Sequence, residues 1–181
     1  MDKAKANADE VVRVTAFKIL ARLIQRSPVG NPELWASNQT AVAYNNAVSE
    51  HNAALRKDKA NLTKNGRLRK GLKVKDSMDV KSPENYTGGR FRGNWQVGFN
   101  TAPQGETGRV DKNGTETLAD GGAILAGFKA SDTQSIYFVN NVPYAVRLEF
   151  GHSKQAPRGM VRITAQEFQK LFNEAARGLN K

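Results

Sequence analysis

The sequence predicts an α+β fold: an antiparallel β-sheet packed by an N-terminal and a C-terminal helix, with a long basic helical and loop insertion. Two stretches predict the strands, because residues 90–101 and 133–140 alternate between apolar and polar side chains. Two others predict the helices, because apolar residues recur at helical spacing in 3–25 and 161–179. We expect the two strands to pair with each other.

The first helix, residues 3–25, contains neither Gly nor Pro. Ser27-Pro28 should end it, because the residue before a proline avoids helical angles. Its apolar face is expected to pack in the core. The alternative is that this terminal helix also contacts a neighbouring subunit.

The next segment combines a loop with a second helix. Residues 29–37 are predicted to form a loop because of Pro28, Gly30 and Pro32, and Leu34 and Trp35 are expected to anchor it. A helix is predicted at 40–59, where the apolar side chains are mostly alanines. Such a face buries little apolar surface, so we expect this helix to be weakly anchored and to become ordered in an assembly.

Residues 61–85 are polar, basic and rich in turn-forming residues, which indicates a linker or a projecting arm. At 181 residues the chain is long enough for one domain with its own core. We therefore predict a single domain, 1–181, that carries an insertion at about 36–85.

The net charge of +11 is concentrated in this insertion. From His51 to Lys81 there are ten Lys or Arg against three Asp, a surplus of seven. Such a cluster can bind a phosphate backbone, face an acidic protein, or form a solvated loop. Because residues 51–81 contain no aromatic for base stacking, the last two alternatives are favoured. The cations that we call the basic arm are Arg56, Lys57, Lys59, Lys64, Arg67, Arg69, Lys70, Lys73 and Lys75.

The strand predicted at 90–101 would turn Trp95 and Phe99 toward the core and Arg90 and Arg92 away from it. Two arginines on one face can pair with carboxylates or phosphates, and the alternative is that they are solvated surface residues. A Pro- and Gly-rich loop follows, and then a short helix at 118–129.

After the second strand, the spacing of apolar residues from Tyr144 to Phe150 suits two short helical turns, with Gly151 as their terminator. Residues 152–159 should form an exposed loop. Thr164 is the expected N-cap of the last helix.

No catalytic, cofactor or metal site is predicted. The chain has no Cys and two His, and no Ser lies in a Gly-x-Ser-x-Gly sequence. Residues 88–93, GGRFRG, lack the Gly-Lys-Ser/Thr ending of a phosphate-binding loop. Glu149 and His152 have a spacing that two metal ligands could use, but no third ligand is nearby. We therefore expect a protein that is not an enzyme.

No run of about 18 apolar residues is present, so a membrane span is not expected. The sequence MDKAKANADE lacks an apolar signal core, and the absence of Cys suits a reducing cytoplasm.

Two separated blocks resemble the tail-completion and minor-tail-component family of long-tailed bacteriophages. The first block comprises SPVGNPELW at residues 27–35 and YTGGRFRGNWQVG at 86–98. The second comprises YA, LEFG, AP and GMVR between residues 144 and 162. Nothing is carried over from the family onto 36–85.

This resemblance implies a virion structural protein of the phage neck or tail end, which forms a hexameric ring, completes the tail and helps to join it to the head connector. The implied partners are further copies of the chain and other neck and tail proteins, in the virion and, during assembly, in the host cytoplasm. The basic arm would face an acidic partner ring or the channel through which DNA passes. Candidate subunit contacts are Arg90, Arg92, Tyr144, Glu149, His152, Lys154 and Arg158.

The alternative is a DNA-binding module that uses the basic segment 56–81, and a small hydrolase or nuclease is favoured least. A DNA-binding module would bind duplex DNA with an affinity that falls steeply as salt is raised.

Overall fold

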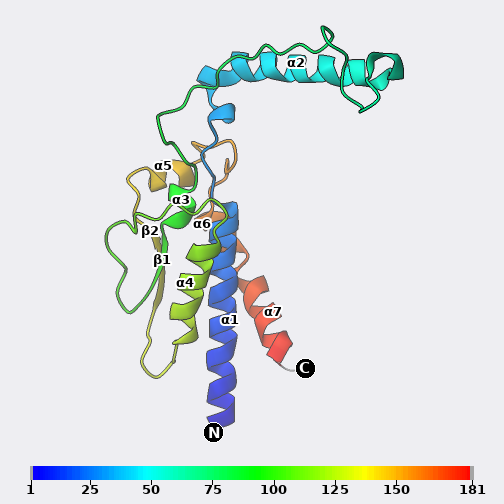
Figure 1. The fold of residues 1–181 in the computed structure, drawn as a ribbon. Coiled ribbons are helices and arrows are strands. Elements are labelled where there is room, and N and C mark those ends of the chain that lie inside the picture. Colours follow the sequence, from blue (N-terminus) through cyan, green and yellow to red (C-terminus); the bar gives the residue numbers. More distant parts are fainter. Residues whose placement is uncertain (1, 180–181) are drawn as a thin grey trace. The chain divides into compact units, whose positions relative to one another are not determined.

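A computed structural model describes residues 2–179, with side chains from residue 7 onward, and divides the chain into two compact units (Figure 1). Unit 1 contains residues 2–30 and 87–179, and unit 2 is Asn31–Tyr86. Helices are combined with a two-stranded antiparallel sheet, so the predicted α+β class is confirmed. The single domain with an insertion at about 36–85 stays a prediction.

The elements follow one another along the chain as Figure 1 labels them. Unit 1 contains α1 (Asp2–Arg26), α3 (Arg90–Gly93), β1 (Trp95–Phe99), α4 (Thr115–Ala126), β2 (Ile136–Asn140), α5 (Ala145–Glu149), α6 (Val161–Gln166) and α7 (Phe168–Leu179). Unit 2 contains α2 (Gln39–Lys57) and three short 3-10 turns, Pro32–Leu34, Ala36–Asn38 and Lys59–Asn61.

The sheet of unit 1 pairs β1 with β2, as predicted, in a register that places Trp95 opposite Asn140 and Phe99 opposite Ile136. Helices α1 and α4 contact β1 and each other, whereas α7 packs against α1. The core forms where these elements meet, and each fully buried Leu or Phe contributes roughly 1.5–3 kcal/mol to folding. Its buried members are Ala16, Leu20, Leu23, Ile24, Phe91, Trp95, Val97, Leu125, Val142, Ala156 and Met160.

The strand predicted at 90–101 is shorter than expected, because its first residues form the helical turn α3. The Asn94 side chain is fully buried and donates to the Arg90 carbonyl at 2.7 Å, which closes this turn. A Cβ atom on Gly93 would lie 2.6 Å from the Arg109 carbonyl oxygen, so a passing loop occupies the place of a side chain. The expectation that Arg90 and Arg92 lie on the outer face of a strand is therefore wrong.

The last helix is also interrupted. Residues 161–179 form α6 and α7, which are separated at Glu167. Glu167 accepts a hydrogen bond from the Arg26 guanidinium at 2.5 Å. Thr164 lies inside α6 and its hydroxyl donates to the Met160 carbonyl, so the prediction that it is the N-cap is wrong.

Three smaller differences concern single residues or helix ends. Leu34 is 58% exposed, so it does not anchor its loop, whereas Trp35 is half-buried and makes an edge-on contact with Tyr86. Helix α4 begins at Thr115 and not at 118, because the buried Asp111 carboxylate accepts hydrogen bonds from backbone N–H groups in the first turn. Helix α2 ends at Lys57.

One hydroxyl links the end of α1 to the start of β1. Ser27 is buried, and its Oγ donates to the Leu23 carbonyl at 2.7 Å. The same Oγ accepts a hydrogen bond from Nε1 of Trp95 at 2.7 Å. The Trp95 ring is thus held in the core by its polar atom as well as by apolar packing.

Replacing Ser27 by Ala should lower the free energy of unfolding by about 1–3 kcal/mol, because the buried N–H of Trp95 loses its acceptor. Urea denaturation followed by circular dichroism measures the change. In a Trp95→Phe background the same replacement should cost clearly less, since no indole N–H is left unpaired. An equal cost in both backgrounds would contradict this role of Ser27.

Candidate functional site

Parts of the two sequence blocks meet the segment between them in unit 1, where α1 ends. Gln155 forms two hydrogen bonds with the backbone of Val29, of 3.2 and 2.8 Å. The Asn140 side chain donates to the Phe91 carbonyl at 2.8 Å. Together with the Trp95–Ser27 bond, these contacts join three segments that are far apart in the sequence. We call this region the junction.

Arg92 links backbone segments at the junction through its guanidinium group. Its guanidinium donates to the carbonyls of Ser27 at 2.7 Å and Lys112 at 2.9 Å, and more weakly to Gln25. These bonds fix the end of α1, where carbonyl groups lack helical partners. Partial burial lowers the pKa of Arg92, and the charge of Asp111 offsets this only in part. Arg92 therefore acts within its own chain.

Arg90 also has a partner within its own chain. Its guanidinium binds the carboxylate of Glu106 in a bidentate arrangement, at 2.7 to 3.1 Å. The hydrogen bonds and the charge of Glu106 raise the pKa of Arg90. Tyr144 lies nearby, half-buried, with its ring centroid 6.2 Å from that of Phe91.

Glu149 caps the N-terminus of α6. Its Oε2 accepts from the backbone N–H groups of Met160 and Val161 at 2.8 and 2.9 Å, and its Oε1 accepts from that of Arg162 at 3.0 Å. The Arg162 guanidinium also binds this carboxylate at 3.3 Å and the Glu149 carbonyl at 2.8 Å. This single carboxylate satisfies the donors that the first turn of a helix leaves free.

The pKa of Glu149 reflects this position. Partial burial acts to raise the pKa, but the backbone hydrogen bonds and the Arg162 side chain outweigh burial and hold it below the ordinary value. The ionised form is therefore the form that stabilises the fold.

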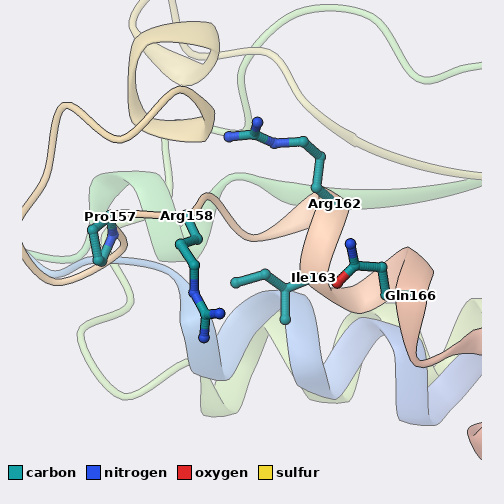
Figure 2. Close-up of a pocket in the computed structure, with 5 residues that line it drawn as sticks. All are labelled: Pro157, Arg158, Arg162, Ile163 and Gln166. Atoms are coloured by element: carbon teal, nitrogen blue, oxygen red, sulfur yellow. The ribbon is translucent and has the colours of Figure 1, made fainter.

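The loop after Glu149 exposes polar side chains to solvent. Gly151 ends α5 with a φ of 85°, as its predicted role as terminator requires. His152, Lys154 and Arg158 are all exposed. Arg158 and Arg162, with Pro157, Ile163 and Gln166, line an open hollow of about 340 Å³, and in Figure 2 the Arg162 side chain points away from that of Arg158.

An exposed apolar surface adjoins this loop. Val146 is 68% exposed and Phe150 is 72% exposed. The Arg162 guanidinium lies 5.2 Å from the centre of the Phe150 ring. Phe150, Arg147, Gly151 and His152 line a shallow pocket of about 520 Å³. We call Val146, Phe150 and these neighbours the α5 surface; its large apolar groups are not covered within the described part of the chain.

The chemistry of these sites is limited. No group of three or more His, Asp or Glu side chains that could hold a metal ion occurs among the described residues. The two hollows described above are lined by arginines, apolar groups, one Gln and one His, without a carboxylate beside the imidazole. Guanidinium groups beside apolar side chains suit contacts with proteins or anions.

Comparisons of this chain with protein families, with curated proteins and with solved structures found no match. Within residues 2–179, no helix has the length and apolar character needed to cross a membrane.

Unit 2 is built on a row of asparagines. Asn38 begins the row just before α2, and two more follow at intervals of seven residues along one side of the helix. Each side chain makes two hydrogen bonds of 2.7 to 3.1 Å with the N–H and C=O of one residue in the returning chain. The pairs are Asn38 with Lys81, Asn45 with Met78, and Asn52 with Val74.

The spacing of this row has a geometric cause. Seven helical residues rise by roughly 10.5 Å, and the three or four residues between the paired positions of the returning chain span roughly 10–13 Å when extended, so the two backbones stay nearly in step. The segment 74–81 is thereby held along α2 without a large apolar core. The seven-residue recurrence of Asn at 38, 45 and 52 is the sequence signal from which this row could have been predicted.

The basic arm lies at the end of unit 2 where α2 finishes and the chain turns back. All nine of its cations are exposed. Between them, residues 61–69 form a hairpin in which the Thr63 N–H donates to the Arg67 carbonyl at 2.8 Å and the Arg69 N–H donates to the Asn61 carbonyl at 2.9 Å. Among the described residues, none of these cations forms an ion pair.

Replacing Glu149 by Gln should lower the free energy of unfolding by about 1–3 kcal/mol near neutral pH, because charge-assisted hydrogen bonds are lost. Because folding lowers the pKa of Glu149, its contribution is complete above the pKa of the unfolded chain and is lost as pH falls through the folded-state pKa. The gap between wild type and variant should therefore shrink below roughly pH 4, near the ordinary pKa of Glu.

Thermal denaturation over a pH series measures this gap. Glu174→Gln is the matched control, because Glu174 forms only an exposed ion pair with Lys18 and should change stability by less than about 1 kcal/mol. A gap for Glu149→Gln that stays constant down to acidic pH would contradict the capping role.

Replacing Asn52 by Ala should weaken the attachment of residues 74–81 to α2, because two hydrogen bonds to Val74, worth about 1 kcal/mol each, are lost. The amide of Val74 should then exchange its hydrogen roughly 10- to 30-fold faster, the factor that corresponds to about 1.4–2 kcal/mol. Hydrogen exchange measured by NMR tests this. Asn46→Ala, at an exposed position of the same helix, should leave the exchange unchanged.

Proposed function

We propose that this chain is a structural protein of a bacteriophage virion, located at the neck or the tail end. Copies of the chain would form a closed ring that completes the tail and helps to join it to the head connector. The two sequence blocks that resemble the tail-completion family support this role, and the hydrogen bonds between Gln155 and Val29 bring parts of them together in the junction. The role needs no catalysis, cofactor or metal.

The α5 surface is the observation that carries the proposal. Val146 and Phe150 follow the junction directly, and both are more than two-thirds exposed. Large apolar groups that stand together in solvent mark sites of protein–protein contact. Arg147 and Arg162 lie beside Phe150, so the partner surface should combine an apolar centre with acidic groups.

A closed ring requires two different faces on each subunit, because the surface that one copy offers must fit another surface on its neighbour. In the proposed ring the α5 surface is one face, with the exposed loop residues His152, Lys154 and Arg158 at its rim. Arg92 and Glu149 contribute by holding the junction and α6 in place. The hexameric symmetry, the neck and tail partners and the virion location rest on the resemblance.

The test is the oligomeric state of the full chain. We expect wild-type protein to form rings in native mass spectrometry and in electron micrographs. Phe150→Asp should yield monomers with an unchanged circular dichroism spectrum, because a charge in the apolar centre of the contact is left unpaired. Val110→Asp is the matched control, since Val110 is 50% exposed in another part of unit 1, and it should leave the rings intact.

Protein that stays monomeric at high concentration and does not bind tails assembled without it would overturn the proposal. In virions, averaged electron micrographs should locate the protein as a ring at the head-proximal end of the tail.

A further inference from the structure

The positive charge of the basic arm exceeds the negative charge that the acidic residues of unit 2 supply. From Arg56 to Lys75 there are nine Lys or Arg and one acid, Asp58, a surplus of eight. The Asp58 carboxylate already accepts from the backbone N–H of Ala60 at 2.8 Å. Like charges at this density repel one another, so their clustering destabilises unit 2 unless a polyanion binds there.

The backbone segments that carry these cations are ordered by hydrogen bonds. They come from the last turn of α2, from the hairpin at 61–69 and from the start of the returning chain. The asparagine row fixes the returning chain against α2, and the Leu62–Leu68 bridge closes the hairpin. Because the backbone that carries the charges is already ordered, binding costs less conformational entropy than the folding of a disordered basic tail.

The side chains of the arm favour phosphate over a protein surface. Six of the nine cations are Lys, a residue that protein–protein interfaces avoid. Residues 56–75 contain no aromatic side chain, and their three leucines, Leu62, Leu68 and Leu72, are half-buried. The arm therefore lacks the apolar anchors of a protein contact and the stacking platforms of a single-strand binder.

We propose that the basic arm binds the phosphate backbone of duplex nucleic acid without reading its base sequence. Duplex DNA carries one charge per roughly 1.7 Å of its axis, so a compact group of cations can neutralise several phosphates at once. Release of the condensed counterions supplies the binding free energy. This inference does not rest on the proposed ring.

The experiment measures binding of the full-length protein to a labelled 30-base-pair duplex of random sequence over a series of salt concentrations. We expect a plot of log K against log salt with a slope of about −4, which corresponds to four or five phosphates. Duplexes of unrelated sequence should bind with equal affinity.

The decisive comparison uses two variants with the same net charge. In the arm variant Lys64, Arg67, Lys70 and Lys73 become Gln; in the control variant Lys112, Lys129, Lys170 and Arg177 become Gln. All eight residues are exposed, and none forms an ion pair in the described structure. The arm variant should lose at least tenfold in affinity and most of the salt slope, and the control variant less than threefold.

Equal losses in the two variants would overturn the proposal, because net charge alone would then explain binding. Poly-glutamate that competes as well as duplex DNA would also overturn it, in favour of an acidic protein partner. Circular dichroism of the arm variant should match wild type, and its oligomeric state should not change, which separates this test from that of the ring.

Discussion

Unit 1 depends on the hydrogen bond between the Trp95 indole and the Ser27 hydroxyl. Burial of a large aromatic ring favours folding, but its N–H would be costly without an acceptor. Ser27 lies where Pro28 ends α1, so the acceptor is supplied by a residue whose place in the chain is fixed by the helix end. One short polar contact inside an apolar core thus fixes the position of β1 relative to the end of α1.

The charged residues of the two sequence blocks act mainly within the chain. Arg92 binds carbonyl groups at the end of α1, and Glu149 binds N–H groups at the start of α6. Both side chains satisfy helix ends that would otherwise lack partners. The apolar side chains of Val146 and Phe150, in contrast, stay exposed. In the proposed ring they would contact a neighbouring copy.

Unit 2 is stabilised differently from unit 1, which has an apolar core. Unit 2 buries few apolar side chains and relies on asparagine amides that bind the backbone of residues 74–81. Backbone recognition of this kind is independent of the side chains in the held segment, whose two Lys and two Asp balance in charge. The surplus of positive charge lies just before it, between Arg56 and Lys73.

The sequence by itself determined the α+β class, the pairing of the two strands and the end of α1, because alternation, helical spacing and Ser27-Pro28 act over short distances. Tertiary structure decided that residues 90–93 form a helical turn, since the loop at 107–109 packs against Gly93 and binds the buried Asn94 side chain. It also decided that Glu149, and not Thr164, caps α6, since the cap is twelve residues from the N–H group of Val161. Partners so distant in sequence leave no local pattern, and only the packed core brings them together.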